Sequence, residues 1–327
     1  MEWIENTFID GQQWLFEKAF EPVMFAAGLG HLLEDGFVAS GWLLVGLLQI
    51  LVLVAVIGPL QRWRPVESVS DSASVRTDIL YTLIHRLGLF RVGLFFLVDP
   101  LFDAMAGTLH LAGIGAFHLE QLWAPITDSA VFSFAIYLLV FDLADYWIHR
   151  GQHSLEWWWR LHSLHHAQQQ MTMWSDNRNH LLDSLLRDSL MVLLAQAIGV
   201  APGQFVAIVA ITQLSESLQH ANLRLWFGGL GERLWISPRF HRVHHSIGIG
   251  HERAPERPGL IGGRSPALGG HNFGVLLPWW DMLFRTANFE LRYDPTGVRD
   301  QVEKGRDYGR GFWSQQWLGV KRLVGKA

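Results

Sequence analysis

A long stretch without a charged residue runs from Gly36 to Gln61, and its central part reads WLLVGLLQILVLVAVIGPL. Charged side chains are costly in hydrocarbon, and a helix of about 20 apolar residues crosses a bilayer core of roughly 30 Å. Within lipid, only helices and closed barrels satisfy every backbone polar group. The stretch therefore predicts a membrane-spanning helix.

The composition of the 327-residue chain agrees with a membrane protein. Half of the residues are hydrophobic and 17% are charged, whereas soluble domains carry about 25% charged residues. The net charge of −4 provides no basic field for nucleic acid, so no nucleic-acid partner is expected. The absence of cysteine excludes disulfides, thiolate nucleophiles and iron–sulfur clusters. Any bound metal must be held by nitrogen or oxygen ligands.

Three further apolar segments follow along the chain. Ile79–Val98 is the weakest of them because it contains His85, Arg86 and Arg91. Ser129–Ile148 predicts another span. Ser189–Ser215 is uncharged, but Pro202 and Gly203 interrupt it, which favours two helices joined by a turn. The sequence thus predicts an all-α helical bundle with about five membrane-embedded helices.

Lysine and arginine mark the cytoplasmic side of a membrane protein. Residues 1–39 hold seven acidic residues and one base, Lys18, and residues 99–128 hold no Lys or Arg. Arg62, Arg64 and Arg76 follow the first span, whereas Arg150 and Arg160 follow the third. The expected topology is an integral, multi-pass protein with an outside N-terminus and the histidine motifs on the cytoplasmic side.

Histidines gather in three short motifs, HRGQH, LHSLHH and HRVHH, which begin at residues 149, 161 and 241. Residues three or four apart share one face of a helix, so each motif presents a chelating set of imidazoles. Crowded imidazoles beside apolar spans repel one another if protonated and need many partners if neutral, and metal coordination satisfies them. The candidate ligands are His149, His153, His162, His165, His166, His241, His244 and His245, with His220 and His180 as the ninth and tenth.

Eight or more nitrogens are too many for one ion, so the count predicts two metals with four or five imidazoles each. Imidazole binds zinc, copper, iron and nickel, and the ligand type alone does not select iron. A hydrolytic zinc site normally needs only three protein ligands. The richness in histidine therefore favours a dinuclear redox centre.

The motifs DLADYWIHRGQH, LHSLHH, HRVHHS and NFGVLLPWWDMLF, within residues 130–286, resemble the fatty acid hydroxylase / sterol desaturase superfamily of membrane di-iron enzymes. The resemblance implies O₂-dependent oxidation of a lipid C–H bond by two iron ions at the membrane surface. It also implies that the three motifs and His220 bind the metals. Zinc can replace iron in purified protein, since metal loading follows availability as well as affinity.

The chain departs from this pattern at several positions. Relatives often have histidine where this chain has Glu216, one helical turn before His220, and Arg285 replaces a usual glycine. We expect Glu216 to lie near the metals and His180, rather than Glu216, to bind a metal directly. Asp145 lies four residues before His149 and could accept its distal N–H. The segment between His245 and Asn272 is longer than in most relatives.

These features divide the chain into a membrane region with two apolar spans (1–128), a catalytic domain (129–286) and a C-terminal tail (287–327). In the tail, FWSQQWLGVKRLVGK predicts either an interfacial helix or an ordinary surface helix. We expect a lipid hydroxylase or desaturase that receives electrons from a separate ferredoxin, or from a cytochrome b5-like protein with its reductase. The alternatives are a membrane metal transporter and a haem-type electron carrier.

Overall fold

The chain is all-α in the computed structural model, which describes residues 2–115, 117–123, 129–247 and 270–326. Within these ranges, β structure is limited to an isolated bridge between Ser246 and Thr296. The predicted boundary at residue 128 and most of the long segment after His245 lie outside the described residues. The α-helices are α1 (Glu2–Leu15), α2 (Glu21–Ala26), α3 (Leu33–Val52), α4 (Gly58–Trp63), α5 (Ser72–Arg86), α6 (Leu89–Leu97), α7 (Asp99–Leu111), α9 (Ala130–Ser154), α10 (Glu156–His166), α11 (Leu181–Ile198), α12 (Pro202–His220), α13 (Gly228–Gly231), α14 (Pro238–His244), α15 (Trp279–Leu283), α16 (Arg299–Glu303) and α17 (Phe312–Leu323).

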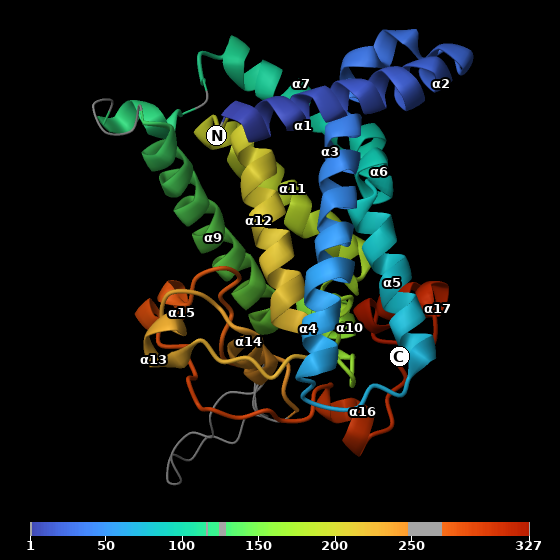
Figure 1. Ribbon diagram of the computed structural model, residues 1–327, viewed down its shortest axis with the longest axis vertical. Coiled ribbons are helices and arrows are strands. Elements are labelled where there is room, and N and C mark those ends of the chain that lie inside the picture. Colours follow the sequence, from blue (N-terminus) through green and yellow to red (C-terminus); the bar gives the residue numbers. More distant parts are fainter. Residues whose placement is uncertain (1, 116, 124–128, 248–269, 327) are drawn as a thin grey trace.

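The helices are arranged in a central bundle with different elements at its two ends (Figure 1). Helices α3, α5, α6, α9, α11 and α12 run roughly along the long axis of the molecule. Helices α1, α2 and α7 lie at one end, together with the N-terminus. The short helices α13 to α16 lie at the other end with α10, α17 and the C-terminus. We call the second end the cap.

Two of the continuous helical segments are long and apolar enough to cross a membrane, Gly30–Trp63 and Ala130–Ser154. The first joins α3 to α4 through one π-helical turn, Leu53–Ile57. The expected span at Ile79–Val98 is instead divided into α5 and α6, because Gly88 adopts a left-handed conformation with φ of 79°. The predicted helical hairpin is present as α11 and α12.

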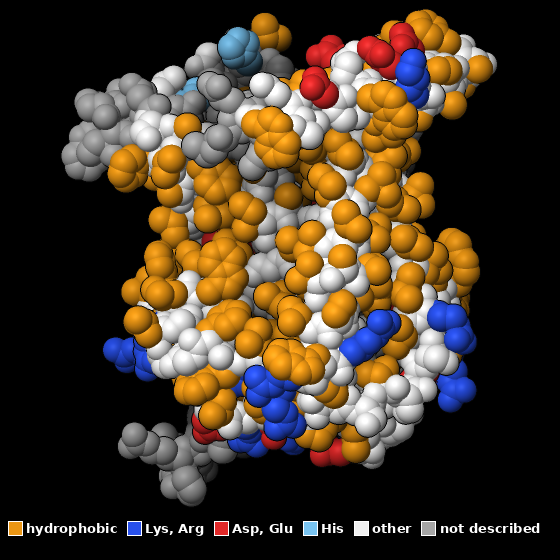
Figure 2. Space-filling model, in the orientation of Figure 1, with side chains coloured by type: hydrophobic (Ala, Val, Ile, Leu, Met, Phe, Trp, Pro, Cys, Tyr) orange, Lys and Arg blue, Asp and Glu red, His pale blue; other side chains and the backbone are white. Residues whose placement is uncertain are grey.

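The kind of side chain on the surface changes along the long axis of the molecule (Figure 2). On the visible face, acidic side chains gather at the α1 end and Lys and Arg at the cap, with a broad hydrophobic surface between them. The apolar residues exposed on α3 include Leu47, Leu48 and Leu51. A large exposed apolar surface of this kind is typical of a protein that lipid surrounds.

A network of buried polar side chains connects α5 to α12 near the cap. Arg86 of α5 forms an ion pair with Asp176 at 2.8 Å and donates to the Ser217 hydroxyl of α12 at 3.0 Å. Gly46 allows α3 to pack closely against α5 at Arg86, since a Cβ at Gly46 would overlap the Arg86 carbonyl. Glycine is the residue that permits so close an approach between helix backbones.

Arg285, which stands where the family resemblance leads us to expect glycine, adopts a left-handed conformation with φ of 58°. This conformation costs a side chain with a Cβ about 1–2 kcal/mol, and part of that cost is offset by the greater entropy that glycine loses on folding. We expect Arg285→Gly to raise the free energy of unfolding by about 1 kcal/mol, as measured by thermal denaturation in detergent.

Asn272→Gly is the matched control, because Asn272 has a similar φ of 62°. Its side chain donates to the carbonyls of Phe240 and Asn288 and accepts from the Asn288 N–H. Glycine would lose these bonds, so this variant should be less stable than the parent protein. Destabilisation by Arg285→Gly would contradict the argument from backbone strain.

Candidate metal centre

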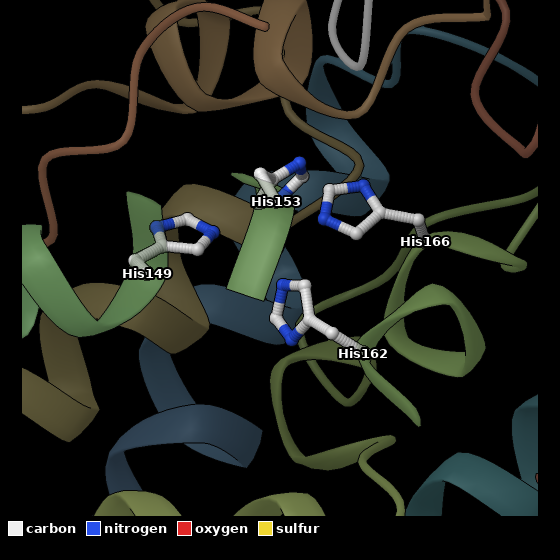
Figure 3. A group of neighbouring side chains, drawn as sticks. All are labelled: His149, His153, His162 and His166. Carbon is white, nitrogen blue, oxygen red and sulfur yellow. The ribbon is translucent and has the colours of Figure 1, made fainter. Parts of the chain in front are cut away.

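The first group of possible ligands comes from two consecutive helices. His149 and His153 lie one turn apart on α9, and His162 and His166 lie one turn apart on α10. The four rings point toward one another (Figure 3), and each offers a nitrogen within 4.8 Å of the others. Leu155, in an extended conformation, separates the two helices and allows α10 to fold back beside α9. We call these four residues the first tetrad.

A second tetrad combines residues that are distant in the sequence. It consists of His165 from α10, His220 at the end of α12, and His241 and His245 from the α14 segment. The Nε2 atom of His220 lies 3.1 Å from that of His165 and 3.1 Å from that of His241. Nitrogens that share one ion at bond lengths of about 2.0–2.1 Å come similarly close.

The two tetrads adjoin each other. The rings of His166 and His245 are stacked with centroids 4.2 Å apart, and a nitrogen of His244 lies within 4.8 Å of nitrogens of both. The His244 ring also lies 4.5 Å from the ring of His149. All nine histidines expected from the three motifs and from His220 therefore meet in one cluster, and each is buried.

Several rings are oriented by acceptors at Nδ1. His149 pairs with the Phe273 carbonyl at 2.8 Å, His244 with the His271 carbonyl at 2.7 Å, and His162 with the Asp183 carboxylate at 2.9 Å. Such a bond places the proton on Nδ1 and leaves the Nε2 lone pair available to a metal. The Nδ1 atom of His220 pairs in the same way with the Glu216 carbonyl at 2.8 Å.

The donor set fits bound metal ions. The Nε2 atom of His162 is buried and has no hydrogen-bond partner among the described residues. Burial also lowers the pKa of His165, His241 and His245 well below the usual value, which keeps these imidazoles neutral. Neutral, desolvated nitrogens that converge on one another are the form in which histidine binds a metal.

His180, the tenth expected ligand, lies outside both tetrads. Its Nε2 pairs with the Gln316 carbonyl of α17 at 2.9 Å, and its Nδ1 accepts from the Leu182 N–H at 3.2 Å. His180 therefore caps α11 and holds α17 against it. Because both ring nitrogens are engaged with backbone groups, we omit His180 from the ligand set.

The two carboxylates expected at the site lie near it but do not orient the rings. Asp145 binds Arg187 of α11 at 2.9 Å, whereas the distal nitrogen of His149 uses the Phe273 carbonyl instead. The expected hydrogen bond from His149 to Asp145 is therefore not formed, and the prediction was wrong at this point. The Glu216 carboxylate lies 3.6 Å from the same Arg187, and the hydrogen bond of His220 to this residue is made to the backbone carbonyl.

Other carboxylates support the site. Asp183, which lies outside the sequence motifs, accepts hydrogen bonds from His162, Gln152 and Trp158. Asp142 accepts from the N–H groups of Leu276 and Leu277.

Asp281, in the WWD motif, binds the N–H of Phe273 at 2.8 Å and that of Gly274 at 2.7 Å. It thereby holds in place the Phe273 carbonyl that orients His149. Asp281 thus anchors the segment that contains Phe273 and Gly274 beside the metal centre.

Comparisons with known proteins agree with this geometry. Residues 134–286 match the fatty acid hydroxylase family. The chain is 26% identical to ornithine lipid hydroxylase OlsE of Rhizobium tropici over 256 residues, which cover 77% of this chain and 70% of that protein. It is 26% identical to alkylglycerol monooxygenase of Caenorhabditis elegans over 49% of this chain and 28% of that protein. It is 27% identical to the alkylglycerol monooxygenase of Danio rerio over 52% of this chain and 33% of that protein.

The matched region spans a third or less of the alkylglycerol monooxygenases. No solved structure matches the chain significantly. The family match nevertheless begins within α9 and ends just after α15, so it contains all nine clustered histidines and the carboxylates that hold them. By this match and by its paired histidine tetrads, the region from residue 134 to residue 286 is identified as a fatty acid hydroxylase domain.

Proposed function

We propose that the protein is a membrane-embedded di-iron hydroxylase that inserts one oxygen atom of O₂ into a C–H bond of a lipid. The observation that carries the proposal is the pair of adjoining histidine tetrads, buried where apolar helices meet the cap. Two iron ions held there would supply the activation of O₂. The named activities of the relatives, ornithine lipid hydroxylation and alkylglycerol monooxygenation, support a lipid as the substrate.

In this proposal the nine clustered histidines hold the two ions, and zinc can occupy the same nitrogens in purified protein. Asp183 and the carbonyls of Phe273 and His271 keep the rings in the orientation that binding requires. Each hydroxylation consumes two electrons and two protons with O₂. We infer that a separate one-electron donor, such as a ferredoxin or a cytochrome b5-like protein, supplies the electrons. Desaturation of the lipid is the alternative outcome of the same chemistry.

The position of the histidines also bears on the two competing functions. A transporter needs ligands distributed along the spans, and a haem carrier needs histidines paired across them. Among the described residues, every group of three or more possible metal ligands lies in the one cluster at the cap. This concentration favours the oxygenase.

Profiling of lipids in cells with and without the protein tests the function directly. A mass increase of about 16 on one lipid class, dependent on O₂ and lost in a His165→Ala variant, is the expected result. A decrease of about 2 in mass would indicate desaturation instead. An unchanged lipid profile, with an expressed and metal-loaded protein, would reject both reactions.

We further propose that the cap faces the cytoplasm. The basic side chains at the cap and the acidic residues at the α1 end follow the charge asymmetry of membrane proteins. Single cysteines at Ser154 and Ser68, which are exposed near the cap, should react with an impermeant thiol reagent only from the cytoplasmic side. A cysteine at the exposed Thr108 should react only from the outside.

The chain has no native cysteine, so each signal comes from one position. Labelling of Ser154→Cys and Ser68→Cys from opposite sides would contradict a shared cap. Labelling of both from the outside would reverse the proposed orientation.

A further inference from the structure

A cavity of about 90 Å³ opens against the histidine cluster, and its walls are unusually polar for an enzyme that oxidises a lipid. One wall is made of rings from both tetrads, including His149, His165 and His220. Charged side chains make up much of the remaining lining. They include Asp145 of α9, Arg187 and Asp188 of α11 and Glu216 of α12, and also Arg86, Asp176 and Asp183.

Three of these charged groups form a unit centred on Arg187. The guanidinium lies 2.9 Å from the Asp145 carboxylate and 3.6 Å from the Glu216 carboxylate. Arg187 and Glu216 can form further hydrogen bonds, because their side chains remain 29% and 22% exposed. The rings of His149, His162 and His220 are oriented by other groups, so the charges of this unit are not needed to position those rings.

A second cavity adjoins the first on the side of the apolar bundle. It is lined by Phe141 of α9, Met191 of α11, and Phe205 and Ile208 of α12. Asp145, Arg187, Asp188 and Gln213 line both cavities. A substrate that passes from the apolar cavity to the histidines must therefore pass the Arg187 unit.

A plain hydrocarbon chain at this point would remove water from charged groups without replacing its hydrogen bonds, which is unfavourable. A group with both donors and acceptors can bond to the carboxylates and to the guanidinium at once. We propose that Arg187, with Asp145 and Glu216, selects lipids whose reacting carbon lies within a few bonds of a hydroxyl or amide group. The remaining hydrocarbon then occupies the apolar cavity. This assignment rests on the hydroxylase function proposed above.

The test is equilibrium binding of two chain-matched probes, hexadecanamide and hexadecane, to the full-length zinc-loaded protein in detergent. The natural tryptophan fluorescence can report binding, and no turnover is needed. We expect the amide to bind at least tenfold more tightly than the alkane. In Arg187→Met this preference should fall to threefold or less.

Two further variants keep the test decisive. The double variant Asp145→Asn, Arg187→Gln removes both charges of the ion pair together, so neither is left buried without its partner. It should reduce the preference for the amide as well, and it replaces Arg187→Met in the test if that variant does not fold. Met191→Ala, in the apolar cavity, should weaken both probes without changing their ratio. Equal binding of both probes to the parent protein, or a preference kept in the charge variants, would overturn the assignment. A preference for the amide in a protein that yields no oxidised lipid would reject the hydroxylase function but not the selectivity.

Discussion

Replacement of His165 by alanine is expected to remove most of the metal from the second tetrad and to reduce lipid oxidation more than 100-fold. The Nε2 atom of His165 lies 3.1 Å from that of His220, and the ring is buried, with its centroid 5.3 Å from that of His166 in the first tetrad. Alanine leaves three nitrogens where four converge. The loss should exceed the 10–100-fold effect typical of residues that only orient a ligand. Elemental analysis of purified protein and product formation measure the two effects.

His180→Ala is the matched control, since His180 is equally buried but lies outside the tetrads. Loss of its bonds to Gln316 and Leu182 should destabilise the protein by about 1 kcal/mol, as loss of a helix cap does, and should leave the metal content unchanged. A loss of metal as large as that in His165→Ala would return His180 to the ligand set. Full metal and full turnover in His165→Ala would reject the metal centre.

The nine clustered histidines could be predicted from the sequence because helical spacing is a local property. His149 with His153 and His162 with His166 share helix faces whatever the tertiary fold. His220 could be added because the turn at Pro202 returns the chain toward the first motif. His180 has no such spacing to another histidine, and its interactions depend on α17, which lies far along the sequence.

The groups that orient the rings were less predictable. Spacing of four residues suggested Asp145 for His149, but Arg187 from a neighbouring helix binds that carboxylate instead. Asp183 reaches His162 across two helices, and no sequence period connects them. The carbonyls of Phe273 and His271 have no sequence signature at all, since every residue carries a carbonyl.

Helix positions were predictable where apolar composition or a helix breaker defines them. Gly36–Gln61 lies within one long helical segment, and Pro202 begins α12 as expected. The division between α5 and α6 depends on the backbone conformation of Gly88, which an apolar run does not reveal.

The C-terminal helix shows the same limit on prediction from sequence alone. Trp313 and Trp317 are exposed, as an interfacial helix requires, but Arg322 is buried and donates to the Arg160 carbonyl of α10. The tail thus packs against the catalytic region as well as presenting aromatic residues to its surroundings.

Replacement of Asp183 by alanine is expected to weaken metal binding by the first tetrad 10–100-fold. The side chain is only 1% exposed, and its two oxygens accept from His162 at 2.9 Å and from Gln152 and Trp158 at 2.7 Å each. Without the carboxylate, the His162 ring loses the acceptor that fixes its proton on Nδ1. Three buried donors lose their partner, so the protein should also lose about 1–3 kcal/mol of stability. Competition with a zinc chelator measures the affinity.

A comparable loss of stability without a loss of affinity is expected from Asp78→Asn, which separates the two effects. Asp78 is also fully buried and bonds to Arg178, Gln168 and Ser175, but it contacts no member of the tetrads. The zinc affinity of Asp183→Asn should lie between that of the parent protein and that of Asp183→Ala. The amide keeps one acceptor oxygen but turns its NH₂ group toward other donors. If Asp183→Ala bound zinc as tightly as the parent protein, the carboxylate would hold only Gln152 and Trp158 in place, and His162 would be positioned by packing alone.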